Sequence, residues 1–178
     1  MMILRRAARR MAVVAAAIGV VAGSTVAPPA SATATTVVPD GVYGIAFQGD
    51  EDSLLTHLST GEGLPTVLLP AFGRPGYQEW EVVRDSRTTQ IIRNLHSGLY
   101  LGLGGGVPQQ HRPVVATPYP YSWTIRAGSA PDRVLIASAV GDDRLRLDRA
   151  PTWTYPPRVD IQLPLDDGSQ EWQLTPHE

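Results

Sequence analysis

Tryptophan recurs near the start of three short strand-like runs, which are Gln78-Glu79-Trp80-Glu81-Val82, Tyr121-Ser122-Trp123-Thr124-Ile125 and Gln170-Glu171-Trp172-Gln173-Leu174. The three tryptophans are 43 and 49 residues apart. A repeat of this length is typical of architectures in which one supersecondary unit is copied around a common core. The repeat therefore predicts that the whole domain is built from three similar units.

Further short runs recur between the tryptophans, in the same order in each copy. Many of them alternate apolar and polar side chains between turn residues, which is the pattern of half-buried antiparallel strands. The first runs of the three copies are 41–47, 90–95 and 133–138, the second are 53–58, 99–103 and 145–148, and the third are 66–69, 113–116 and 158–163. With no helical periodicity, these runs predict an all-β unit that closes on itself and so removes its unpaired edges.

This arrangement resembles a β-trefoil, in which three four-stranded pseudo-repeats supply six strands to a barrel and six to a cap. The resemblance implies a β-trefoil domain over residues 40–178. We expect Trp80, Trp123 and Trp172 to fill the barrel core, where each indole N–H must find a hydrogen-bond acceptor.

The first 32 residues have the composition of a secretory signal peptide. Four arginines precede the apolar run 11–23, and Ala30-Ser31-Ala32 matches the small-x-small cleavage pattern. The apolar run is shorter than the roughly 20 residues of a membrane-spanning helix. Cleavage after Ala32 would leave a flexible lead-in at 33–39 and a chain without Cys, Met or Lys. We therefore expect a secreted protein of bacterial composition, stabilised by packing rather than by disulfides.

The expected mature chain is acidic, with 11 arginines against 17 acidic residues. A net negative charge with only one basic segment, 86–131, argues against nucleic acid as the partner. The four histidines lack metal-ligand spacing, and no nucleophile elbow or zinc-protease motif occurs. These observations predict a monomeric binding protein that is not an enzyme and needs no cofactor, metal or membrane.

The Gln-x-Trp endings at 78–80 and 170–172 are similar to those of ricin-type (ricin B-like) β-trefoil lectins. Those lectins also place an early Asp, a stacking aromatic ring and an Asn or Gln in each sugar pocket. The middle copy has no acid between Ser86 and Ala130, whereas Leu145-Arg146-Leu147-Asp148 in the third copy is a partial match. The resemblance implies carbohydrate binding at one or two sites as the alternative function.

The stretch Ile91-Ile92-Arg93-Asn94-Leu95-His96-Ser97-Gly98-Leu99-Tyr100-Leu101-Gly102, together with 41–45 and 171–174, is similar to cnispin-type fungal serine protease inhibitors. This resemblance covers about residues 40–178. It implies that a rigid loop occupies the substrate cleft of a serine protease, with affinity that comes from preorganisation. Serine protease inhibition is our main functional prediction, and the target is either trypsin-like or chymotrypsin- or subtilisin-like.

Two connections match loops that inhibitors of this fold use. The loop before the last strand is implicated in the fungal family, and here it contains Leu165 and no basic residue, which would suit a chymotrypsin- or subtilisin-like target. The junction of the first and second repeats, used by plant Kunitz inhibitors, carries Arg84 and the Arg87–Thr88 bond. An arginine at the cleaved position would suit a trypsin-like protease.

A third connection, 149–157, lies outside the threefold pattern. Arg149, followed by Ala150, is a further candidate for the cleaved position. The same loop carries Trp153 and Tyr155 between prolines, and exposed rigid aromatic side chains are typical binding anchors. Two alternatives remain for Trp153, which is either such an anchor or a plug that folds back over the barrel end.

Overall fold

The computed structural model describes residues 38–177, except 143 and 166. The predicted signal peptide, 1–32, and all but the end of the predicted lead-in lie outside the described residues. Val38, which falls within the predicted lead-in at 33–39, is buried. Its backbone N–H and C=O both bond to the side-chain amide of Gln90, at 3.1 and 2.7 Å.

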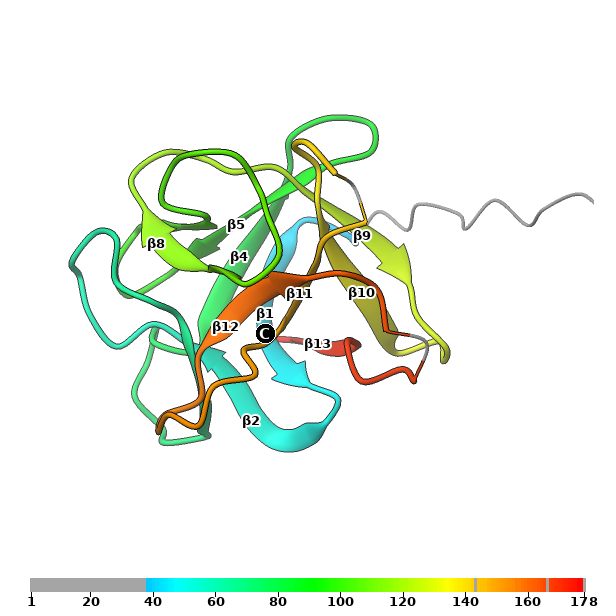
Figure 1. Cartoon of the computed structure of the whole chain (residues 1–178). Coiled ribbons are helices and arrows are strands. Elements are labelled where there is room, and N and C mark those ends of the chain that lie inside the picture. Colours follow the sequence, from blue (N-terminus) through cyan, green and yellow to red (C-terminus); the bar gives the residue numbers. More distant parts are fainter. Residues whose placement is uncertain (1–37, 143, 166, 178) are drawn as a thin grey trace, which may run out of the picture. The chain divides into compact units, whose positions relative to one another are not determined.

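All regular elements in the described part of the chain are strands (Figure 1). They are β1 (Gly41–Phe47), β2 (Asp50–Thr56), β3 (Val67–Pro70), β4 (Glu79–Arg84), β5 (Gln90–Asn94), β6 (Tyr100–Gly102), β7 (Arg112–Pro113), β8 (Val115–Thr117), β9 (Trp123–Ala127), β10 (Arg133–Ser138), β11 (Arg146–Arg149), β12 (Val159–Gln162) and β13 (Trp172–Pro176). None of the described residues belongs to a helix that is long and apolar enough to cross a membrane.

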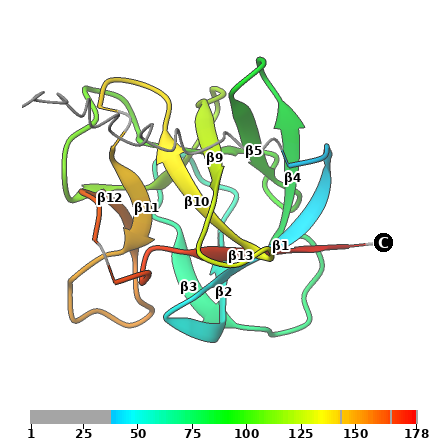
Figure 2. The ribbon, with the colours of Figure 1, turned by 90° about the vertical axis from the view of Figure 1, so that its right-hand side faces the viewer.

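Six of these strands form a closed antiparallel barrel (Figure 2). Strand β1 pairs with β4, β4 with β5, β5 with β9, β9 with β10, β10 with β13, and β13 with β1 again. Each repeat contributes its first and its fourth strand to this ring. The ring therefore has no unpaired edge, which is the closure that the strand pattern predicts.

The second and third strands of each repeat form hairpins that pair with one another outside the barrel. The hairpins are β2–β3, β6–β8 and β11–β12. Bridges at Pro65–Val115 and Val67–Arg158, and the pairing of β7 with β12, join the three hairpins into a cap. The single run predicted at 113–116 is split, because β7 pairs with the third repeat while β8 pairs with its own.

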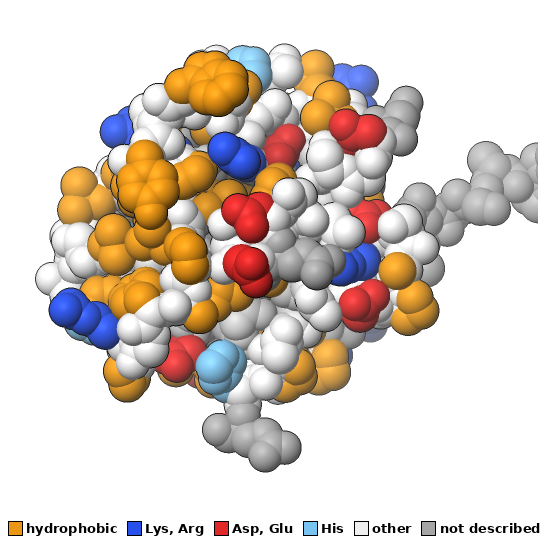
Figure 3. All heavy atoms as spheres, turned by 90° about the horizontal axis from the view of Figure 1, so that it is seen from below, with side chains coloured by type: hydrophobic (Ala, Val, Ile, Leu, Met, Phe, Trp, Pro, Cys, Tyr) orange, Lys and Arg blue, Asp and Glu red, His pale blue; other side chains and the backbone are white. Residues whose placement is uncertain are grey.

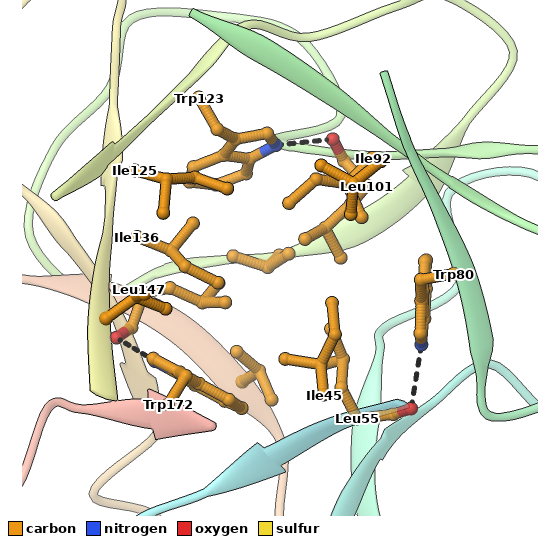
Figure 4. Close-up of a cluster of buried hydrophobic side chains, with 14 of the residues drawn as sticks. Ile45, Leu55, Trp80, Ile92, Leu101, Trp123, Ile125, Ile136, Leu147 and Trp172 are labelled. Carbon is orange, nitrogen blue, oxygen red and sulfur yellow. Dashed lines mark hydrogen bonds between the residues drawn. The ribbon is translucent and has the colours of Figure 1, made fainter. Parts of the chain in front are cut away.

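The three repeat tryptophans fill the core, as predicted, and each is fully buried (Figure 4). Their indole N–H groups donate to backbone carbonyl oxygens of Leu55, Leu101 and Leu147, at 2.8, 2.9 and 3.0 Å. Each bond joins the fourth strand of a repeat to that repeat's hairpin, so the same side chain fills the barrel and holds the cap.

Candidate functional site

Two polar side chains meet beside the buried tryptophan in the first and third repeats. Gln78 Nε2 donates to Thr56 Oγ1 at 3.0 Å, and Gln170 Nε2 donates to Asp148 Oδ2 at 3.0 Å. All four side chains are buried. The Gln-x-Trp glutamines are therefore internal links between strands, and they leave little polar surface for a ligand.

The partial lectin match in the third repeat lies in a buried polar cluster. Asp148 and Asp160 face each other across the β11–β12 pair, and burial raises the pKa of both carboxyls. Asp160 Oδ1 accepts from Gln162 Nε2 at 2.9 Å, and Asp160 Oδ2 lies 3.6 Å from His111 Nδ1. The protein's own donors thus occupy both carboxylates, and Asp148 is only 5% exposed.

An open hollow of about 500 Å³ lies in the middle repeat. The segment 117–121, which contains two prolines and two tyrosines, forms one wall, and 103–105 forms another. The ring of Tyr119 is 77% exposed. Thr117 Oγ1 donates to the backbone oxygen of Tyr119 at 2.6 Å and so holds this wall in place.

Tyr121 takes the position that glutamine has in the other two repeats. Its ring centroid is 4.9 Å from that of Trp123, and its hydroxyl lies 2.5 Å from Ser138 Oγ. Burial raises the pKa of this hydroxyl. A Cβ atom on Gly102 would lie 3.1 Å from both Tyr121 Cβ and Thr117 Oγ1, so only glycine leaves the wall undisturbed.

The carboxylate of this pocket comes from the first repeat. Glu62 lines the hollow, and the turn that carries it is tied to the middle hairpin by two backbone bonds. Gly63 N donates to Ala116 O at 2.8 Å, and Ala116 N donates to Leu64 O at 3.0 Å. The middle repeat itself supplies no acid, and the carboxylate beside this hollow comes across the cap from the first repeat.

The first repeat has a hollow at the equivalent place, after its third strand. It measures about 530 Å³ and is lined by Leu58, by 69–72 and by Arg74. No carboxylate or amide side chain contributes to it. Among the described residues, no group of three or more His, Asp or Glu side chains is placed to hold a metal ion.

No family model and no curated protein sequence matches the chain. Solved structures do resemble it. The ricin B-like lectin of Macrolepiota procera, in complex with lactose, matches over 80% of this chain and all of its own, with 20% identity and a TM-score of 0.67. The Rhizoctonia solani agglutinin matches over 81% and 100%, with 18% identity and a TM-score of 0.68. The designed threefold-symmetric protein ThreeFoil matches over 78% and 100%, with 16% identity and a TM-score of 0.68.

The fold is a β-trefoil. At these identities the neighbours show the fold alone. The cnispin-type inhibitor family that the sequence resembles stays a prediction.

The loop between β11 and β12 of the trefoil projects its aromatic side chains into solvent. Trp153 is 103% exposed and Tyr155 is 84% exposed. Of the two alternatives for Trp153, the structure supports an exposed position, and the plug over the barrel end is wrong.

The Arg149–Ala150 bond at the base of that loop is held within the hairpin. Arg149 O accepts from Gln162 Nε2 at 2.9 Å, and Ala150 N donates to Arg158 O at 2.8 Å. Ala150 is buried. A protease cleft pairs with free extended backbone, so this geometry disfavours Arg149 as the cleaved position.

The arginines at the connection between β4 and β5 are exposed to solvent. Arg84, Arg87 and Thr88 are exposed. Ser86 N donates to Thr89 O at 3.1 Å, and Ser86 Oγ accepts from the backbone N–H groups of Thr88 and Thr89, at 3.2 Å each. The Arg87–Thr88 bond therefore lies on a tight turn with its own hydrogen bonds.

Leu165 lies on a separate connection, between β12 and β13. It is 46% exposed, and its backbone N–H donates to Gln170 Oε1 at 2.8 Å. The residue after it, 166, lies outside the described residues. The predicted site residues thus lie on three different connections. None of them lines the pocket of the middle repeat. The sequence did not indicate this pocket, because its residues come from two different repeats.

Proposed function

We propose that this β-trefoil is a carbohydrate-binding protein whose main site is the middle-repeat pocket. The observation that carries the proposal is the open hollow with Tyr119 and Tyr121 on one side and Glu62 at its edge. The C–H face of a sugar ring is apolar and packs on an aromatic ring, while a carboxylate accepts hydrogen bonds from sugar hydroxyls. A concave site with apolar walls and few polar groups is the usual form of a small-ligand site.

The structural neighbours support the same chemistry. The Macrolepiota procera lectin was solved in complex with lactose, and it matches 80% of this chain. We propose binding without catalysis and without a cofactor, by a monomer.

The test is a glycan array of neutral oligosaccharides that includes lactose, followed by calorimetric titration of the strongest ligand. A single shallow pocket is expected to give a dissociation constant on the order of 1 mM, which corresponds to about −4 kcal/mol. Tyr119→Ala and Glu62→Gln should each weaken binding about tenfold. Tyr155→Ala removes an exposed tyrosine elsewhere and should bind as the wild type does. Equal affinity of Tyr119→Ala and wild type would refute the site.

A second candidate function is the predicted serine protease inhibition. The observation that favours it is the exposed Arg87–Thr88 bond on a turn fixed by its own hydrogen bonds, since a preorganised loop loses little entropy on binding. Trypsin inhibition that Arg87→Ala abolishes and Arg84→Ala preserves would support it. Leu165→Ala tests the alternative of a chymotrypsin- or subtilisin-like target. No inhibition of any of these enzymes by the wild type would exclude this function.

We also propose that the protein is secreted, on the composition of residues 1–32. Protein recovered from the medium of an expressing bacterium should begin at Thr33. An intact amino terminus on exported protein would contradict cleavage after Ala32.

A further inference from the structure

The loop between β11 and β12 carries features that the middle-repeat pocket does not use. A hollow of about 250 Å³ lies against it, lined by 149–153. Its lining residues include Arg149, Thr152 and Trp153, and no acidic residue lines it.

The loop is held at its carboxyl end by a neighbouring hairpin. Leu68 N donates to Pro157 O at 2.8 Å, which ties the loop to the first repeat. Within the loop, Thr154 N donates to Thr152 O at 2.9 Å. Trp153 therefore projects from a fixed base, and a ligand that stacks on it orders few additional groups.

Two arginines at the ends of the loop are available to a ligand. In the part of the chain that the structure describes, neither Arg149 nor Arg158 has a side-chain hydrogen bond or ion pair. The nearby carboxylates, Asp148 and Asp160, are buried and accept from the protein's own donors. The two guanidinium groups are thus exposed to solvent, whereas the neighbouring carboxylates are buried.

A second hollow, of about 220 Å³, also borders the loop and shares Ala150, Pro151 and Thr152 with the first. Its lining includes Arg158, Thr154, His111 and the edge of Asp160. Figure 3 shows one face of the molecule, with hydrophobic side chains gathered on one side of it and basic side chains at their margins. The first hollow therefore has an arginine and a threonine beside Trp153, whereas the second has an arginine, two threonines and Asp160 in its lining.

We infer that this loop is a second saccharide site, specific for an oligosaccharide that carries carboxylates. One sugar ring stacks on Trp153 while its carboxylate pairs with Arg149, because a guanidinium binds a carboxylate through two parallel hydrogen bonds. The next ring lies toward Thr154 and Arg158. The inference rests on the proposed function only for the choice of a saccharide, since the two sites share no residue.

The test uses tetragalacturonate and its fully methyl-esterified form, which is the same chain without charges. Trp153 is exposed and the other three tryptophans are buried, so the part of the fluorescence that acrylamide quenches comes from this site. The acid tetramer should shift the emission to the blue and protect it from acrylamide. Its affinity by calorimetry should fall with salt, and the ester should bind at least tenfold more weakly.

Variants separate this site from the pocket. Trp153→Ala and Arg149→Ala should each weaken tetragalacturonate binding about tenfold or more, whereas Arg87→Ala removes an equal charge elsewhere and should have no effect. Tyr119→Ala should weaken neutral glycan binding about tenfold and leave tetragalacturonate binding unchanged. The reverse pattern, with tetragalacturonate lost in Tyr119→Ala, would overturn the inference.

Three other results would also overturn it. They are no binding of tetragalacturonate, equal binding of acid and ester, and equal or tighter binding of a hexaglutamate peptide, which would make the loop a protein-binding surface. Failure of all neutral glycans on the array would refute the middle-repeat pocket and leave this site standing.

Discussion

Two tryptophans of this protein have opposite environments, one in the core and one in solvent. Trp172 is fully buried and donates its indole N–H to Leu147 O at 3.0 Å, whereas Trp153 is entirely exposed. The same substitution therefore removes packing and a hydrogen bond at one position and almost nothing at the other.

Trp172→Phe should lower the free energy of unfolding by about 2–4 kcal/mol, because it leaves a cavity and an unpaired buried carbonyl. Trp153→Phe should change it by less than about 0.5 kcal/mol. Urea unfolding followed by circular dichroism measures both. Equal effects of the two substitutions would contradict the assignment of core and surface.

His57 makes stability depend on pH. It is almost fully buried, its Nδ1 lies 3.1 Å from Ser97 Oγ, and its Nε2 has no partner among the described residues. Burial, and secondarily the charge of His96, lower the pKa of His57 from its ordinary 6.5. Below about pH 6.5 the unfolded chain therefore binds a proton before the folded chain does, and stability falls until the folded pKa is reached.

His57→Gln should remove this loss. The variant's melting temperature should decline less than that of the wild type between pH 7.5 and pH 5, while the difference between the two proteins stays constant above pH 7. A difference that is the same at every pH would show that His57 does not titrate on unfolding.

At the scale of elements, the middle hairpin differs from the other two in having glycine where they have Thr56 and Asp148. This absence of a side chain lets Tyr121 close the pocket wall. The pocket therefore depends on Gly102, which is needed because it leaves room for Tyr121 and not because of its backbone conformation.

Gly102→Ala should displace Tyr121, weaken neutral glycan binding about tenfold and cost about 1–2 kcal/mol of stability through crowding. Gly73→Ala is the matched control, because an added Cβ there meets no atom within 4 Å but must adopt a φ of +67°. It should cost a similar amount of stability without changing affinity. An unchanged glycan affinity in Gly102→Ala would show that the position of Tyr121 does not matter for binding.

The strands could be predicted because many of them alternate apolar and polar residues between turn residues, and the three tryptophans mark where each repeat ends. The pocket could not be predicted in the same way. Glu62 reaches it from another repeat through backbone bonds to Ala116, and no spacing in the sequence records such a contact. Likewise, the sequence left two alternatives for Trp153, a binding anchor or a plug, because prolines at both ends of a loop do not specify which way its side chain points.

At the scale of the whole molecule, barrel closure depends on β13. This strand pairs with both β1 and β10 and carries Trp172. Deletion of 172–178 should leave two barrel strands with open edges and abolish cooperative unfolding. Thermal scans by circular dichroism measure this, and a cooperative transition in the truncated chain would contradict the role of closure.

The measurement that tests the central claim most directly is a two-dimensional amide NMR titration with the strongest neutral glycan from the array. The account predicts saturable shifts concentrated at 62–63, 103–105 and 117–121, and an about tenfold higher midpoint of the titration in Tyr119→Ala. Shifts concentrated at the 85–89 turn, or none at a saturating glycan concentration, would contradict it.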